Sequence, residues 1–132
     1  MEAKKYIQSI GRRKRAIAQV RLFAGGTGAV TVNSRDIKDY FGTAGLQENA
    51  VSPLKEVGRS ESVDITVRVV GGGLTGQSDA IKMGIARALV KEDETVKISI
   101  KSKGFLTRDP RRKERKKFGL RGARRAKQWR KR

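Results

Sequence analysis

The chain has 132 residues, which suits a single domain, and carries 32 lysines and arginines against 13 aspartates and glutamates, a formal charge of +19. Histidine and cysteine are absent, which excludes zinc fingers, haem ligation, disulfides, thiol nucleophiles and imidazole bases. The charge indicates a polyanionic partner, with nucleic acid as the leading candidate and an anionic membrane surface as the second. We expect a cytosolic protein, because no signal segment or membrane-length apolar run is visible.

The first three apolar segments are predicted to be strands. "KYIQSI" and "RAIAQVRLF" are rich in isoleucine, valine and aromatic residues, and "AVTV" follows a turn signal at residues 24–28. Their short links favour a meander of three neighbouring strands. The first link, residues 11–15, reads "GRRKR" and places four positive charges on one turn.

Two helical segments and a fourth strand are expected in the middle of the chain. Ser34 is a candidate N-cap for a short helix in "NSRDIKDYF". The segment "AGLQENAVSPLKEVG" has helical character, but Pro53 should end or kink it. Residues 62–70 alternate strictly, which predicts a half-buried strand with these residues on its buried face: Val63, Ile65, Val67 and Val69.

The clearest helix runs from Ser78 onward. Its core-facing stripe follows the helical repeat and consists of Ile81, Ile85, Ala88 and Leu89. Small residues on the same helix would let it lie close to a sheet: Ala80, Gly84 and Ala86. The next apolar segment alternates at Val96, Ile98 and Ile100, which favours a strand.

The distribution of charge divides the chain near Gly104. Residues 1–103 carry 18 positive and 11 negative charges, whereas residues 104–132 carry 14 and 2. The second segment has no sustained apolar period, so it cannot bury enough surface to offset its chain entropy and should be disordered when alone. We therefore predict a folded body at residues 1–103 and an extended basic tail at residues 104–132.

A glycine motif separates the fourth strand from the long helix. Gly71, Gly73 and Gly76 fit G-x-G-x-x-G, the pattern of a dinucleotide-binding turn. That reading requires an acidic residue at the end of the next strand, but Glu92–Glu94 precede the next apolar segment, and too few strands follow for a doubly wound sheet. A P-loop is excluded because no Gly-Lys-Ser/Thr closes the loop.

Two interpretations of the glycine loop remain. One is a tight strand-to-helix turn with no further role. The other is a phosphate site, because Gly71, Gly72 and Gly73 leave backbone amides unshielded at a helix N-terminus. A polynucleotide backbone agrees better with the charge of the chain than a dinucleotide does.

Three clusters of basic residues favour nucleic acid over a merely solvated surface, because arginine binds phosphates bidentately and stacks on bases. The first cluster is Arg12, Arg13, Lys14 and Arg15. The other two lie in the tail and comprise Arg108, Arg111, Arg112, Lys113, Arg115, Lys116 and Lys117, then Arg121, Arg124, Arg125, Arg130, Lys131 and Arg132. Trp129 either stacks on a base or packs on protein. No set of residues looks catalytic, so we predict no enzyme activity, cofactor or metal site.

The motifs occur in an order that resembles one family. "GRRKRAIAQVRLF", "GTGAVTVN", "DYF", "GGGLTGQSDAIKMGIARAL" and "GFLTRDPRRKERKKFGLRGARRA", with a final Lys-Arg, are similar to the ninth protein of the small ribosomal subunit in its bacterial or organellar form. The resemblance implies an α+β fold, a two-layer α/β sandwich. Its four-stranded mixed sheet would follow the order three strands, helix, strand, helix, with a left-handed crossover. It also implies that "TVKISIKSK" is helical, against the local alternation.

The resemblance further implies a structural constituent of the subunit head, on a cytoplasmic or organellar ribosome, beside neighbouring ribosomal proteins. Ribosomal RNA would be bound by the first cluster, by the glycine loop with Gln77, and by the tail as far as Arg125. Arg130, Lys131 and Arg132 would contact transfer RNA in the peptidyl site. Departures from the family pattern at Lys127, Trp129 and Arg130 leave the path of the last six residues open. The alternatives are a nucleotide-dependent oxidoreductase and a free nucleic-acid chaperone or DNA-compacting protein.

Overall fold

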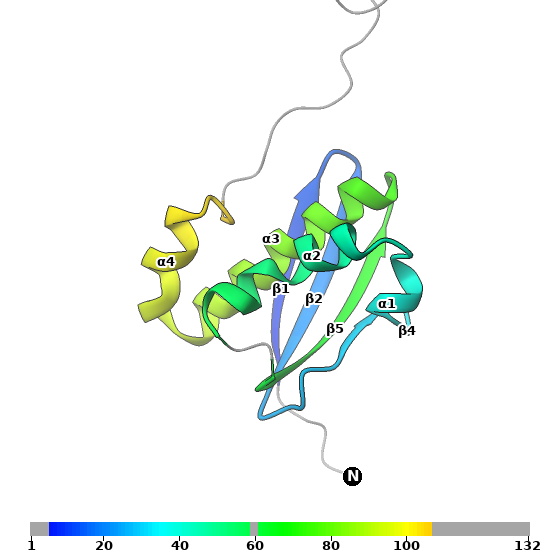
Figure 1. Cartoon of the computed structure of the whole chain (residues 1–132). Coiled ribbons are helices and arrows are strands. Elements are labelled where there is room, and N and C mark those ends of the chain that lie inside the picture. The colour runs from blue at the N-terminus through cyan, green and yellow to red at the C-terminus, as the bar shows by residue number, and fades with distance from the viewer. Residues whose placement is uncertain (1–5, 59–60, 107–132) are drawn as a thin grey trace, which may run out of the picture.

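The computed structural model describes residues 6–58 and 61–106, which form a sheet with its helices packed on one face (Figure 1). This two-layer α+β arrangement is the expected one. The elements in chain order are β1 (Ile7–Arg13), β2 (Ala16–Ala24), β3 (Val30–Val32), β4 (Arg35–Asp36), α1 (Ile37–Tyr40), α2 (Ala44–Glu56), β5 (Val63–Val70), α3 (Leu74–Glu92), the 3-10 helix η1 (Glu94–Val96) and α4 (Lys97–Ser102).

The sheet has five strands in the order β1-β2-β5-β3-β4, so the expected count of four is wrong. The additional strand is β4, a two-residue strand that pairs with β3 across a turn formed by Asn33 and Ser34, both with positive φ. β3 and β5 pair in parallel, and every other neighbouring pair is antiparallel. The segment between β3 and β5, which includes α1 and α2, is a crossover connection between two parallel neighbouring strands.

The expected meander of the first three strands is wrong, because β5 lies between β2 and β3. The loop after β2 is bound to the start of β5. The Gly26 N–H donates to the Ser62 carbonyl at 3.0 Å, and the N–H groups of Thr27 and Ala29 donate to the Asp64 carboxylate at 2.9 and 3.1 Å. The loop therefore passes the end of β5 instead of closing a hairpin, and β3 reaches the far side of that strand.

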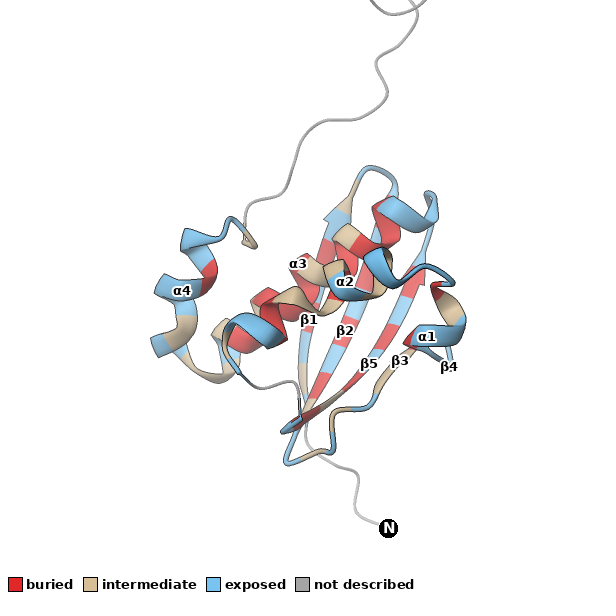
Figure 2. Cartoon of the chain, viewed as in Figure 1, coloured by how far each residue is buried: buried red, intermediate tan, exposed pale blue. Residues whose placement is uncertain are grey.

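The core lies between the sheet and the two long helices. Figure 2 shows buried and exposed residues alternating along β2 and β5, as is typical of a sheet with one covered face. The predicted stripe of α3 is confirmed, since Ile81, Ile85, Ala88 and Leu89 are all buried. The predicted close approach is also confirmed: a Cβ added to Gly84 would lie 2.5 Å from Cγ2 of Val20. The helix starts earlier than expected, at Leu74.

The helices α1 and α2 correct two expectations. Asp36, not Ser34, caps α1, because its carboxylate accepts from the Lys38 N–H at 3.0 Å. Pro53 lies inside α2 and does not end it. A proline at this position cannot donate to the Asn49 carbonyl one turn earlier. The Ser52 hydroxyl donates to that carbonyl instead, at 2.7 Å, so the acceptor is satisfied and the helix continues.

The segment after α3 is helical, so the strand predicted from its alternation is wrong and the helix implied by the resemblance is confirmed. Ile100 is fully buried and Val96 is half-buried, whereas Ile98 is 82% exposed. Residues four apart share a helix face, and the residue between them points away. After α4, Phe105 and Leu106 pack against the core. Within the described residues, no helix is long and apolar enough to cross a membrane.

Candidate nucleic-acid interface

The arginine turn (residues 12–15) and the glycine loop (residues 71–73) lie against each other. A Cβ added to Gly71 would lie 2.5 Å from the Arg15 carbonyl oxygen, and one added to Gly72 would lie 3.2 Å from the Ala16 nitrogen. The pairing of β2 with β5 causes this contact, because it places Ile17 opposite Val70 at the ends of the two strands. Two segments that the sequence marked separately therefore form one surface.

Backbone conformation explains why glycine occupies this loop. Gly71 and Gly72 have φ values of +79° and +62°, in the left-handed region that residues with a side chain rarely adopt. Because a Cβ at Gly71 would also meet the Arg15 carbonyl, no larger residue fits there without moving the arginine turn. The loop thus holds the turn at close range.

The N-terminus of α3 opens onto the same surface. Gly73 is the N-cap of this 19-residue helix and has no side chain to accept from the first-turn N–H groups. Leu74 and Thr75 are exposed, and a Cβ added to Gly73 would have no other atom within 4 Å. Unpaired N–H groups and the helix dipole favour an anion at such an end.

The cations of the arginine turn point in different directions. Arg12, Lys14 and Arg15 are exposed beside the glycine loop. Arg13 instead faces the helices, and its side chain is 12% exposed. Its Nε donates to Oδ2 of Asp79 in α3 at 3.4 Å. Three of the four charges are therefore available to an anionic ligand, while the fourth joins the turn to the helix layer.

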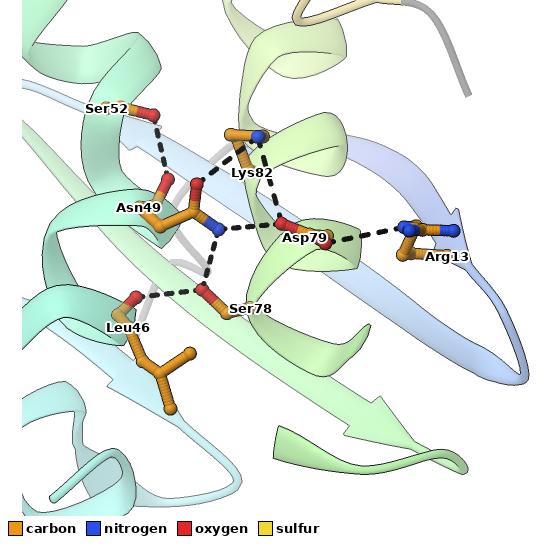
Figure 3. A network of polar contacts seen from close by, with 7 residues as sticks. All are labelled: Arg13, Leu46, Asn49, Ser52, Ser78, Asp79 and Lys82. Atoms are coloured by element: carbon orange, nitrogen blue, oxygen red, sulfur yellow. Dashed lines mark hydrogen bonds and ion pairs between the residues drawn. The ribbon is translucent and has the colours of Figure 1, made fainter. Parts of the chain in front are cut away.

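A polar network continues from Arg13 into α2 (Figure 3). Nδ2 of Asn49 donates to Oδ1 of Asp79 at 2.8 Å and lies 3.1 Å from the Ser78 hydroxyl, which donates in turn to a carbonyl of α2. Nζ of Lys82 lies 3.2 Å from Oδ1 of Asn49 and 3.8 Å from the Asp79 carboxylate. The network fixes the arginine turn relative to both long helices.

Gln77 supports the glycine loop from inside. Its side chain is buried, its amide donates to the Gly71 carbonyl at 3.0 Å, and its carbonyl accepts from the Tyr40 hydroxyl. Gln77 was expected to contact RNA, whereas its polar atoms are engaged within the protein. Tyr40 is a contributor that sequence reasoning missed, because nothing in the sequence relates α1 to the loop after β5.

A family model described as ribosomal protein S9/S16 matches residues 11–132. The chain belongs to this family. It is therefore a structural, non-enzymatic ribosomal protein of the small subunit that binds ribosomal RNA, which agrees with the resemblance found in the sequence. The glycine loop of this S9/S16 protein lies next to basic side chains, a geometry that suits the phosphates of a polynucleotide.

The body of this S9/S16 protein carries further cations that were not among the expected binding residues. Arg87 donates from Nη1 to the Ile10 carbonyl at 2.8 Å, and Lys91 donates from Nζ to the Gln8 carbonyl at 2.9 Å. Both cover the free edge of β1 and so protect it from pairing with another strand. Arg21 and Arg68 lie on the uncovered face of the sheet, where strict alternation in both strands could have indicated them.

The remaining predicted site residues of the S9/S16 chain lie outside the described residues. They are Arg108, Arg111, Arg112, Lys113, Arg115, Lys116, Lys117, Arg121, Arg124, Arg125, Trp129, Arg130, Lys131 and Arg132. Within residues 6–58 and 61–106, no three acidic side chains gather as a metal site would require.

Proposed function

We propose that this protein binds ribosomal RNA in the head of the small subunit and supports peptidyl-site transfer RNA with its basic tail. The contact between the arginine turn and the glycine loop carries the first part of the proposal. It brings exposed guanidinium and ammonium groups to the open N-terminus of α3, so that an RNA backbone could meet both at once.

The residues of this surface take different roles in the proposal. Arg12, Lys14 and Arg15 bind phosphates, and Gly73 lets the RNA backbone approach the first-turn N–H groups of α3. Arg13 and Gln77 act mainly by holding the arginine turn and the glycine loop in place, through Asp79 and the Gly71 carbonyl. Phosphate contacts of this kind fix the position of the protein without reading sequence.

The charge of the tail supports the second part of the proposal. Residues 104–132 carry 14 positive and 2 negative charges, enough to neutralise many phosphates. We assign the basic residues from Arg108 to Arg125 to ribosomal RNA and the last three, Arg130, Lys131 and Arg132, to transfer RNA. Neighbouring ribosomal proteins of the head are the expected protein partners.

One experiment tests the arginine turn. The double variant Lys14→Ala, Arg15→Ala should bind ribosomal RNA on the order of tenfold more weakly, and the slope of log affinity against log salt should fall by about 2. The matched control is Arg35→Ala, Lys55→Ala, which removes the same charge from exposed positions on β4 and α2. Equal affinities for the two variants would contradict the assignment.

A second experiment tests the end of the tail. Deletion of Arg130, Lys131 and Arg132 removes three of the 32 positive charges, so assembly into the subunit should survive. The affinity of programmed small subunits for deacylated transfer RNA should fall on the order of tenfold, or about 1.4 kcal/mol, since solvated phosphate contacts contribute less than well-made ones.

The pattern across several transfer RNAs decides the mechanism of the tail. A similar loss for all of them, reduced at high salt, supports contacts to the backbone. Unchanged affinity for every transfer RNA would show that the chain end does not reach it. A loss confined to one transfer RNA would show base readout instead.

Two simple measurements separate the alternatives. An oxidoreductase built on the glycine loop requires saturable NAD binding, which we expect to be absent. A free chaperone or DNA-compacting protein would dissociate from small subunits in high salt, whereas a ribosomal protein co-sediments with them.

A further inference from the structure

Within residues 6–58 and 61–106, one face of the sheet has no helix on it. α2 and α3 both pack on the other face, and the outward residues of β1, β2 and β5 are mostly exposed (Figures 1 and 2). Strand pairing arranges these residues in four rows across the sheet. In order, the rows are Phe23 and Asp64, with the Tyr6 ring packed on Phe23; Gln8, Arg21 and Thr66; Ile10, Gln19 and Arg68; and Arg12, Ile17 and Val70.

The charge of this open face is positive. Arg12, Arg21 and Arg68 lie on it, and within the described residues none of the three forms an ion pair. The single carboxylate in the four rows belongs to Asp64, which accepts from the backbone N–H groups of Thr27 and Ala29. As far as the described residues go, the arginines are therefore available to an anionic ligand.

An aromatic cluster orders one of these arginines. The guanidinium of Arg21 lies over the Tyr6 ring, 4.9 Å from its centroid, and the Tyr6 and Phe23 rings are 5.5 Å apart. Arg21 nevertheless remains exposed, so its guanidinium can also meet a ligand. Nucleic-acid bases stack on arginine planes as well as on aromatic rings, and a pre-ordered side chain loses less entropy on binding.

Apolar side chains lie between the arginines. Ile17 and Val70 line one shallow hollow with Gln19 and Arg68, and a second hollow next to it is lined by Gln19, Arg21, Thr66 and Arg68. Ile10, Ile17 and Val70 are 39%, 38% and 56% exposed, so each presents apolar area to whatever covers the face. When the phosphates of an RNA strand bind the neighbouring arginines, its sugars and the faces of its bases can pack on these apolar side chains.

The open face is continuous with the arginine turn and the glycine loop. Its fourth row, Arg12, Ile17 and Val70, lies at the ends of the strands that lead into residues 13–16 and 71–73. A strand of RNA that binds at the turn can therefore pass directly onto the sheet.

We propose that the open face of the sheet is a second contact surface for ribosomal RNA, in which Arg21 and Arg68 bind phosphates or stack on a base and Ile17 and Val70 pack on the nucleotides between them. This inference rests on the proposed function, because it requires the same RNA to bind at the arginine turn. A protein partner fits less well. The centre of a protein interface is depleted in charge, whereas here every apolar residue has an arginine in its own row or the next.

Crosslinking in assembled small subunits separates this inference from the proposed function. A photoreactive residue at Gln19, in the centre of the open face, and another at Lys14, in the arginine turn, should both crosslink to RNA. RNA crosslinks from position 14, with protein crosslinks or none from position 19, would overturn the inference and leave the proposed function standing. RNA crosslinks from position 19 alone would contradict the proposed role of the arginine turn, on which the inference rests, and so would overturn both. If neither position crosslinks to RNA, both the inference and the proposed role of the arginine turn are overturned.

An affinity measurement tests the assigned arginines. The double variant Arg21→Ala, Arg68→Ala should bind ribosomal RNA on the order of tenfold more weakly, with a salt slope lower by about 2, than the matched control Arg35→Ala, Lys55→Ala. Its urea midpoint should match that of the control, because all four side chains are exposed. Equal RNA affinity for the two double variants would overturn the assignment of Arg21 and Arg68.

Discussion

Glycines serve two opposite purposes around α3. Gly11 and Gly84 lie where the middle of the helix contacts β1 and β2, and there the space for a side chain is already filled. Gly73 lies at the start of the same helix, where the space is open. The first pair concerns packing, and the second position concerns access to the backbone. The residue type alone does not distinguish the two purposes, but the surroundings of the missing Cβ do.

The distances make the contrast concrete. A Cβ on Gly11 would lie 1.9 Å from the Ala80 carbonyl oxygen and 2.4 Å from the Gly84 nitrogen, both backbone atoms of α3. A Cβ on Gly73 would meet no atom within 4 Å. Substitutions at the packed glycines should therefore affect stability, and substitutions at Gly73 should affect binding.

The largest effect is expected for Gly11→Ala. The added methyl group cannot be accommodated by a side-chain rotation, because the atoms that it meets belong to the helix backbone. Overpacking of this kind costs about 3 kcal/mol of unfolding free energy, at the upper end of the usual range. Urea denaturation of the free protein measures it. A midpoint equal to that of the unmodified protein would show that α3 can move away from β1 at no cost.

Gly71→Ala should have the next largest effect, and it should lower both the stability of the protein and its affinity for RNA. The residue would adopt a left-handed conformation, and its Cβ would press on the Arg15 carbonyl at 2.5 Å. We expect a loss of about 2 kcal/mol in stability, together with a displaced arginine turn and weaker RNA binding. RNA affinity measured at a temperature well below the unfolding transition separates the loss of stability from the loss of binding, because the variant is then folded. Affinity that stays unchanged in the folded variant would mean that the position of the turn is unimportant for binding.

Gly73→Glu should weaken binding without weakening folding. Gly73 has an ordinary φ of −99° and open space, so a side chain is accommodated, and a carboxylate near a helix N-terminus is favourable for the helix. The same carboxylate repels phosphate, and we expect RNA affinity to fall on the order of tenfold at fixed salt. Gly73→Gln is the control of matched size. If Gln weakens binding as much as Glu, bulk and not charge is responsible, and if stability collapses while affinity holds, the loop is only a packing element.

Much of this fold was predictable from local patterns. Composition identified β1 and β2, alternation identified β5 because its two faces differ, and the helical repeat identified the buried stripe of α3. The pattern of Val96, Ile98 and Ile100 misled because residues four apart also share a face of a helix. Pro53 misled because the Ser52 hydroxyl compensates locally for the missing N–H.

Contacts between distant segments could not be predicted. β5 lies between β2 and β3, and the loop at residues 25–29 bonds to its Asp64, but no local pattern in the sequence reports such long-range contacts. For the same reason the arginine turn and the glycine loop were each recognised, but their contact was not. Arg21 and Arg68 were overlooked as binding residues because each is a single charge within a strand, and only strand pairing brings them together.

The smallest effect, and the only stabilising one, is expected for Gly45→Ala. Gly45 is exposed in the first turn of α2, and a Cβ there would meet no atom within 4 Å. Alanine restricts the unfolded chain more than glycine and has the higher helix propensity, so the variant should gain about 0.5 kcal/mol. The same glycine-to-alanine change therefore destabilises the protein at Gly11 and stabilises it at Gly45. The RNA affinity of the Gly45→Ala variant should equal that of the unmodified protein. Urea denaturation of the two variants side by side measures the contrast. A loss of stability at Gly45 would mean that the open space around a missing Cβ does not predict the sign of the effect, and the distinction drawn between Gly11 and Gly73 would lose its basis.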